Sequence, residues 1–367
     1  MKVEVLQERL AKALNIVSRV AASTKAGLPI LSNVLLRAED KQLVLTATNL
    51  ELATVEYVNA KASKNGTITV PAKLLSNFVS NLPKDTIKLS SEGDKLTIEA
   101  GGYKSILNGI AADDFPELPS IDEKVAVTFK IPVDIFKESV NQVIIASSND
   151  MTRPALTGVY LNTFEGTLYI AATDGYRLAD KKLVEKVKSE IKAIVPTAAF
   201  REVLSSLSDD MEDIEISIVD TLIRFRMGEV EIISKLIDAS FPDYRQLIPK
   251  KNNLSVELDK AELLRMTKVA ALFAQESNGS IVCEAKKDDG SFSVSAVASE
   301  VGENSSSLKA DIKDDAKVTL NSRYLLDALN ATTEDKVILE ISGKLSPIVV
   351  KNVKTDDYTH IIMPLKS

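Results

Sequence analysis

The hydrophobic pattern is most regular in the middle of the chain, where Leu168, Ile170 and Ala172 fall on one side of an extended run. The residues between them fall on the other side. Alternation with a period of two predicts a β-strand with one buried face. A break at Glu165-Gly166 separates this run from an earlier strand around Val159. We therefore predict a β-hairpin.

Directly after this run, Asp174-Gly175 favours a sharp reversal of the chain. Asp and Gly adopt the positive φ values of tight turns more easily than other residues. The turn would present Tyr176, Arg177 and Leu178 at the end of the hairpin. Two interpretations stay open: a plain hairpin turn, or a functional corner that displays these side chains.

The chain contains this pattern again at nearly constant offsets. A shift of 125 residues superposes matching residues: Pro29 on Pro154, Leu45 on Ile170, Thr48 on Thr173 and Pro71 on Pro196. A further shift of similar length leads to a third copy. Self-similarity at a fixed period is the signature of repeated structural units. We predict three similar domains of ordinary size, at residues 1–122, 123–250 and 251–367.

Each predicted domain carries two segments with the hydrophobic period of an amphipathic helix. In the first segment Leu6, Leu10, Leu14 and Val17 recur at helical spacing. The second segment begins at Pro71, because the first helical position tolerates proline. The corresponding segments in the other two copies are residues 132–148, 196–208, 259–275 and 321–331.

About eight short alternating runs in each copy predict strands. Two helices cannot cover both faces of that much sheet. We therefore expect both helices of a domain on one side of an antiparallel-sheet shell. The predicted fold class is α+β.

Composition limits the compartment and the possible covalent bonds. The 367 residues are 45% hydrophobic, which is enough for each copy to bury a core. The chain has no run of 18 apolar residues and no signal-peptide pattern, so we expect a cytoplasmic protein. Its single cysteine, Cys283, rules out an internal disulfide and is typical of a small buried hydrophobic residue.

Residues that build catalytic or metal sites are scarce. One histidine, His360, cannot form a multi-histidine metal site, and one cysteine cannot form a thiolate zinc site. No glycine-rich phosphate loop of a standard type occurs. We predict no catalytic residue, no metal and no cofactor, and we interpret His360 as a strand-edge residue.

The distribution of charge bears on nucleic-acid binding. A net charge of −7 argues against it, but a polyanion responds to the face that it meets. The predicted helices carry cations mostly away from their apolar positions: Lys12, Arg19, Lys73, Arg201, Lys268 and Arg323. This pattern fits ordinary solvated helix faces, or a weakly positive surface that attracts phosphates without reading bases.

Five motifs together make the chain resemble the bacterial DNA polymerase III β subunits, the sliding clamps. The motifs are LPIL at 28–31, ATDGYRLA at 172–179, FPDYRQLIP at 241–249, NSRYLLDAL at 321–329 and the terminal IIMPLK. The resemblance covers the full length. It implies a DNA clamp fold without catalytic activity, assembled head-to-tail as a homodimeric ring around double-stranded DNA. It also implies a peptide pocket for the replicative polymerase, the clamp loader, other polymerases and repair proteins.

The resemblance assigns residues to three surfaces. The partner-peptide pocket would comprise Tyr160, Leu161, Thr173, Gly175, Tyr176, Arg177, Leu178, Pro242, Arg245, Leu247, Asn321, Tyr324, Ile361, Met363, Pro364 and Leu365. The DNA-facing residues would be Lys12, Arg19, Lys25, Lys73, Arg153, Arg201 and Lys268. The dimer interface would contain Ile106, Leu107, Leu272 and Phe273. We expect the apolar run 361–365 to lie near water, as part of the pocket.

Two other functions are compatible with parts of the pattern. An enzyme acting on nucleotides or sugars at the DGYR corner would need a base beside Asp174, and the sequence does not supply one. A passive repeat scaffold would need neither DNA nor partners.

Overall fold

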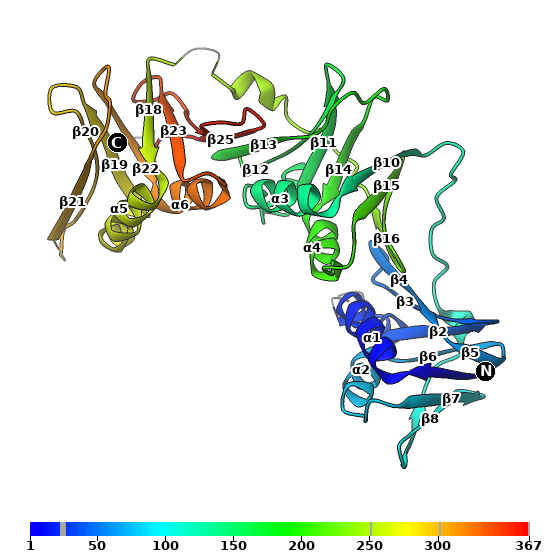
Figure 1. Cartoon of the computed structure of the whole chain (residues 1–367). Coiled ribbons are helices and arrows are strands. Elements are labelled where there is room, and N and C mark those ends of the chain that lie inside the picture. Colours follow the sequence, from blue (N-terminus) through cyan, green and yellow to red (C-terminus); the bar gives the residue numbers. More distant parts are fainter. Residues whose placement is uncertain (23–26, 250–251, 301, 366–367) are drawn as a thin grey trace. The chain divides into compact units, whose positions relative to one another are not determined.

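The computed structural model describes residues 1–22, 27–249, 252–300 and 302–365. Over these residues the chain forms six α-helices, five short 3-10 helices and 25 strands (Figure 1). The strands build four sheets, in which neighbours run antiparallel. The separate helices and antiparallel sheets confirm the α+β prediction. No helix in this part of the chain is long and apolar enough to cross a bilayer.

The chain forms two compact units, each of which is described by itself. The first contains residues 1–133 and 198–236, and the second contains residues 134–197 and 237–367.

The first unit contains two sheets. The five-stranded sheet has the order β5 (Lys61–Lys64), β1 (Lys2–Leu6), β7 (Thr86–Glu92), β8 (Lys95–Ala100) and β9 (Tyr103–Asn108). The eight-stranded sheet has the order β10 (Val127–Pro132), β15 (Asp213–Val219), β16 (Leu222–Met227), β17 (Val230–Lys235), β4 (Leu52–Asn59), β3 (Gln42–Thr48), β2 (Asn33–Glu39) and β6 (Gly66–Pro71).

The second unit also contains two sheets. The eight-stranded sheet has the order β14 (Lys192–Pro196), β11 (Gly158–Phe164), β12 (Thr167–Thr173), β13 (Arg177–Val184), β25 (Tyr358–Ile362), β24 (Ile348–Asn352), β23 (Lys336–Ile341) and β18 (Leu254–Asp259). The four-stranded sheet has the order β21 (Gly302–Lys309), β20 (Ser291–Ala298), β19 (Ser280–Lys286) and β22 (Ala316–Asn321).

Both eight-stranded sheets cross the boundaries between the sequence repeats. In the first unit β17 pairs with β4, and in the second unit β13 pairs with β25. Each pairing joins strands of neighbouring repeats through backbone hydrogen bonds, so neither strand is left as an exposed edge. The repeats are sequence units, whereas the sheets are shared between them.

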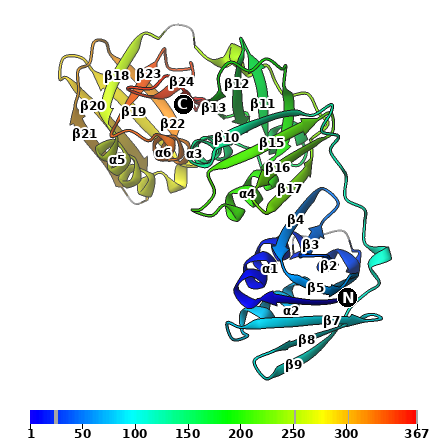
Figure 2. The same ribbon diagram turned by 45° about the vertical axis from the view of Figure 1, so that its right-hand side comes forward.

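The six α-helices are α1 (Gln7–Ala22), α2 (Ala72–Ser80), α3 (Val133–Ile144), α4 (Thr197–Ser206), α5 (Lys260–Phe273) and α6 (Ser322–Ala331). All six predicted helices are confirmed. In the first repeat α1 packs on α2 and on β3 and β4, and in the third repeat α5 and α6 lie side by side (Figure 2). The five 3-10 helices are η1 (Pro29–Ser32), η2 (Ala112–Asp114), η3 (Pro154–Thr157), η4 (Tyr244–Leu247) and η5 (Gln275–Ser277).

Helix starts lie one residue later than the sequence predicted. Pro71 ends β6 and has an extended ψ of 113°, so it precedes α2 instead of forming its first residue. In the third repeat the two equivalent positions are N-caps. The side chain of Asp259 accepts a 2.9 Å hydrogen bond from the Glu262 backbone N–H, and Asn321 accepts one from Arg323 at 2.9 Å.

Strand registers confirm the repeat. Leu36 pairs with Leu45 in the first copy, and Leu161 pairs with Ile170 in the second, which is the same pairing moved by 125 residues. The hairpin turns match in conformation as well, because Asp40 and Glu165 both have positive φ values, 44° and 49°. The sequence offset therefore reflects one backbone path used twice.

Two residues singled out for their chemistry lie in the interior. Cys283 is buried in the core of the third repeat, as predicted, and burial raises the pKa of its thiol to about 12. The interpretation of His360 as a strand-edge residue is wrong. His360 is fully buried in β25, between β13 and β24, because the sheet continues on both sides of this strand.

Candidate functional site

The DGYR corner is an Asx-type turn held by its own side chains. Oδ1 of Asp174 accepts hydrogen bonds from the backbone N–H groups of Tyr176 (2.9 Å) and Arg177 (3.0 Å). The Thr173 hydroxyl donates to the carbonyl of Arg177 at 2.6 Å, and Gly175 has a φ of 90°. The turn leaves the Tyr176 side chain 60% exposed.

The first repeat contains the same turn without the DGYR residues. There Asn49 accepts hydrogen bonds from Glu51 and Leu52, and Leu50 has a φ of 76° at the position of Gly175. The backbone geometry is thus common to both repeats. What distinguishes the second copy is the arginine that follows, since Leu52 stands at the position of Arg177.

Arg177 is almost buried and is paired inside the protein. Its side chain is 8% exposed. Nε lies 3.1 Å from Oδ2 of Asp174, and Nη1 lies 2.5 Å from Oδ2 of Asp327 in α6. The guanidinium carbon lies 4.6 Å from the ring centroid of Tyr324. These contacts link the DGYR corner to α6 through the Arg177 side chain.

The terminal strand runs beside the corner. In the β13–β25 pair, Leu178 lies opposite Ile361 and Arg177 opposite Ile362, and the Met363 N–H donates to the Tyr176 carbonyl at 2.8 Å. The expectation that the whole apolar ending lies near water is wrong for Ile361 and Ile362. Both are buried because β25 is an interior strand. Met363, just past the strand, is 36% exposed.

The connector between the second and third repeats packs on the same sheet. Its η4 helix inserts Tyr244 into a buried cluster with Ala171, Leu178 and Ile361. The three segments that the sequence singled out, the DGYR corner, the connector and the terminal strand, therefore meet in one place. The three segments meet because β13 pairs with β25, which joins residues far apart in the chain.

A buried polar group holds the connector down. The Tyr244 hydroxyl donates a 2.7 Å hydrogen bond to Oδ1 of Asp180 and accepts one of 3.1 Å from the Asn162 side chain. Burial raises the pKa of Asp180 to about 6, although the Tyr244 hydrogen bond and the charges of Arg245 and Lys182 act in the opposite direction.

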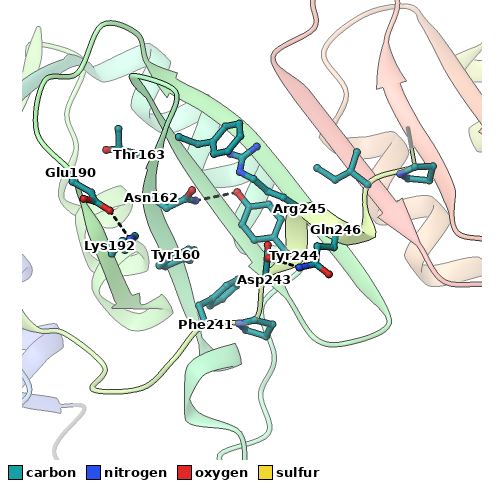
Figure 3. Close-up of a pocket in the computed structure, with 14 residues that line it drawn as sticks. Tyr160, Asn162, Thr163, Glu190, Lys192, Phe241, Asp243, Tyr244, Arg245 and Gln246 are labelled. Carbon is teal, nitrogen blue, oxygen red and sulfur yellow. Dashed lines mark hydrogen bonds and ion pairs between the residues drawn. The ribbon is translucent and has the colours of Figure 1, made fainter. Parts of the chain in front are cut away.

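A hollow of about 990 Å³ opens between the connector and the sheet (Figure 3). Tyr160 and Phe241 form one apolar wall, with their rings stacked at a centroid distance of 4.6 Å. The Glu190–Lys192 ion pair, at 2.5 Å, lies at the side of the hollow. Arg245 also lines it, and its guanidinium stacks on nearby aromatic rings, including Tyr169 at 4.1 Å.

A smaller hollow of about 290 Å³ lies at the DGYR corner. It is lined by Tyr176, Arg177 and Tyr324 together with Arg153. The structure thus distributes the predicted pocket residues over two hollows, because Tyr160, Pro242 and Arg245 line the larger one.

The remaining predicted pocket residues fall into three groups. Leu161, Thr173, Leu178 and Ile361 are buried in the sheet. The Asn321 side chain caps α6, and Gly175 allows the turn through its positive φ. Leu247 and Met363 are exposed, and Pro364 and Leu365 are partly exposed. Sequence reasoning overlooked Phe241, Tyr244 and Asp327, although all three lie within the motifs that carried the resemblance.

The predicted DNA-facing cations differ in their environments. Lys73, Arg153, Arg201 and Lys268 are exposed. Arg19 is paired, since Nη2 lies 2.7 Å from Glu202 and 2.8 Å from the Ser206 hydroxyl. Lys12 lines a hollow with several carboxylates. Lys25 lies outside the described residues.

The predicted interface residues occupy two sheet margins. Ile106 and Leu107 belong to β9, an edge strand of the five-stranded sheet, and Ile106 is 58% exposed. Leu272 on α5 is 66% exposed, whereas Phe273 is partly buried against the core of the third repeat.

Among the described residues, no group of three or more His, Cys, Asp or Glu side chains is placed to hold a metal ion.

Comparison with protein families matches three consecutive segments of the chain. Residues 1–119 match the N-terminal domain of the DNA polymerase III beta subunit, residues 130–243 its central domain, and residues 245–366 its C-terminal domain. The chain belongs to the DNA polymerase III beta subunit family. The enzyme alternative at the DGYR corner finds no support in this assignment.

Individual members of this family match over their full length. The beta sliding clamp of Synechococcus elongatus is 30% identical over 375 aligned residues, covering 100% of this chain and 99% of the relative. The sliding clamp of Bacillus subtilis superposes with a TM-score of 0.94 at 25% identity, covering 100% of this chain and 99% of the other. A sliding clamp of Pseudomonas aeruginosa bound to griselimycin gives a TM-score of 0.94 at 28% identity, covering both chains completely.

Proposed function

We propose that this chain is a cytoplasmic sliding clamp, a homodimeric ring that encircles double-stranded DNA and keeps the replicative polymerase on its template. The observation that carries the proposal is the match to three consecutive clamp domains over nearly the entire chain. We keep the domain division at 1–122, 123–250 and 251–367. In this role the protein has no catalytic site, and other proteins perform the chemistry.

Ring closure would depend on a contact between two different margins of the chain. The edge strand β9 presents the exposed side chains of Tyr103 and Ile106, and an unpaired apolar edge is a template for pairing with another chain. The edge strand β21 and the neighbouring α5 with Leu272 offer the second margin. A contact between unlike surfaces is heterologous, and two such contacts close a dimer when the rotation fits.

DNA would be held by topology, with weak phosphate contacts from the helices. Lys73, Arg201 and Lys268 are exposed and available for such contacts. Arg19, by contrast, would first have to leave Glu202. These residues carry no base-reading arrangement, which fits a protein that must move along any sequence.

Partner proteins would bind at the junction of corner, connector and terminal strand. Tyr176, Leu247 and Met363 expose apolar surface there, and exposed apolar side chains around a hollow are typical of a binding site. We propose that short peptides of the replicative polymerase, the clamp loader, other polymerases and repair proteins use this surface. Tyr176, exposed at the corner, and Gln246, which lines the larger hollow, would influence its peptide preference.

Retention on DNA tests the proposal directly. The protein is loaded onto nicked circular DNA and the circle is then cut at one site. A topological clamp stays on the circle and is released after linearisation, at a rate that exposed-cation variants such as Lys73→Ala change little. Equal retention on circular and linear DNA would contradict the ring mechanism.

A further inference from the structure

A second site of distinctive chemistry lies in the first unit. A hollow of about 580 Å³ is bounded by α1, β4, the turn between β16 and β17, and the segment that precedes β15. It shares no residue with either hollow of the proposed peptide site.

Glu56 lines this hollow and is unusually placed for a carboxylate. Its side chain belongs to β4, where Leu45 and Val230 flank it on the neighbouring strands. Glu56 is only 7% exposed, and its Oε2 atom is buried without a hydrogen-bond partner. An unpaired carboxylate oxygen away from water has a large desolvation cost, so most such groups acquire a partner.

The other charged groups around Glu56 make the hollow acidic. They come from every element that surrounds it: Arg9 and Lys12 on α1, Asp210 and Glu212 before β15, Asp213 at the start of β15, and Glu229 in the turn after β16. With Glu56 the carboxylates outnumber the cations by five to two. The hollow is therefore suited to a positively charged ligand.

Burial is the main cause that raises the pKa of Glu56, to about 7. The charge of Glu229 adds to the effect, while the nearby Lys12 lowers the pKa. Glu56 consequently takes up or releases its proton near neutral pH. A bound cation would favour the ionised form and would therefore bind more tightly as the pH rises.

We propose that this hollow binds the guanidinium group of an arginine side chain presented by a partner protein, with Glu56 as its buried acceptor. A guanidinium is planar and offers parallel N–H groups, which match a carboxylate better than an ammonium does. It is also less strongly hydrated, so it enters a partly closed site at lower cost. The remaining carboxylates at the hollow would hold the outer N–H groups.

The test titrates the full-length protein with N-acetyl-arginine amide and follows binding by calorimetry and by NMR shifts. The matched neutral probe is N-acetyl-citrulline amide, which keeps the shape and removes the charge. Glu56→Gln removes the buried charge with little change in volume. Glu92→Gln, at an exposed carboxylate on β7, is the control. Thermal unfolding at pH 7 verifies that both variants are folded.

Binding of the arginine probe should weaken at least about tenfold in Glu56→Gln and remain unchanged in Glu92→Gln. The citrulline probe should bind at least about tenfold more weakly than the arginine probe. Affinity of the unmodified protein should rise between pH 6 and pH 8, and Glu56→Gln should lose that dependence, because the other carboxylates ordinarily ionise below this range. Equal affinities in the unmodified protein and Glu56→Gln, or equal binding of the two probes, would overturn the proposal.

Discussion

Nη1 of Arg177 donates a 2.5 Å hydrogen bond to Oδ2 of Asp327, which ties the DGYR corner to helix α6. The two residues are 150 positions apart in the chain. Because Arg177 is nearly buried, its positive charge depends on Asp327 and Asp174 for compensation. The corner is thus a structural joint as well as the rim of a proposed binding site.

Asp327→Asn should destabilise the fold by about 1.5–3 kcal/mol, the usual range for losing a hydrogen bond to a charged group. Asp174 remains to pair with Arg177, so the loss should stay below that of a fully unpaired buried charge. Urea unfolding measures the difference. Asp314→Asn, at an exposed turn position, is the matched control. Equal unfolding midpoints for the two variants would show that the pair contributes nothing.

Asp180 and His360 should make opposite contributions to the pH dependence of stability. The pKa of Asp180 is raised from its ordinary value of 3.8 to about 6. Its contribution to the free energy of unfolding is therefore complete below pH 3.8 and is lost as the pH rises through 6. Burial, aided by the charge of Arg177, lowers the pKa of His360 to about 3. The contribution of His360 to the free energy of unfolding is complete above pH 6.5 and is lost as the pH falls toward 3.

Single variants should separate these two effects between pH 4 and pH 6. Asp180→Asn should make stability increase more steeply with pH, and His360→Gln should make it increase less steeply, each by up to about 1.4 kcal/mol per pH unit. Urea unfolding at several pH values gives the slope of the free energy of unfolding against pH. Subtracting the slope of the unmodified protein from that of the variant removes the contribution of the other carboxylates. A slope unchanged in either variant would contradict the assigned pKa of that residue.

Leu272→Ala should weaken dimerisation while leaving the folded subunit intact. The side chain is 66% exposed in the subunit, so truncating it should cost the subunit little stability. If the dimer buries the Leu272 side chain, the substitution should reduce the free energy of dimerisation by about 2–5 kcal/mol per contact. Sedimentation equilibrium gives the dissociation constant. Leu345→Ala, at another exposed leucine, is the control. Phe273 is a poorer probe, because it packs on the core of the third repeat.

Removal of residues 363–367 should abolish binding of short apolar peptides and leave the fold unchanged. The cut spares Ile361 and Ile362, which are core residues of β25, and removes the exposed Met363. Fluorescence anisotropy with a labelled peptide that ends in a Leu-Phe pair measures the effect. Undiminished affinity would place the partner site elsewhere. Tyr176→Ala, on the same rim, should weaken binding without truncation.

Local sequence determined the helices, the hairpins and the repeat, because each depends on residues close together in the chain. The alternation of Leu168, Ile170 and Ala172 is sufficient for β12, and the 125-residue offset is repeated in strand register and in turn conformation. Three helix starts were misplaced by one residue because Pro71, Pro132 and Pro196 each end a strand, and a proline can end a strand as readily as it begins a helix.

The tertiary structure alone decided which of these elements are neighbours. The pairing of β13 with β25 brings Leu178 opposite Ile361, and it buries His360 and Ile362 in positions that look exposed in a terminal segment. The pairing of Arg177 with Asp327 and the isolation of Glu56 arise in the same way. Burial and pKa depend on every strand and helix that surrounds a residue, and these come from distant parts of the chain. Local periodicity carries no information about them.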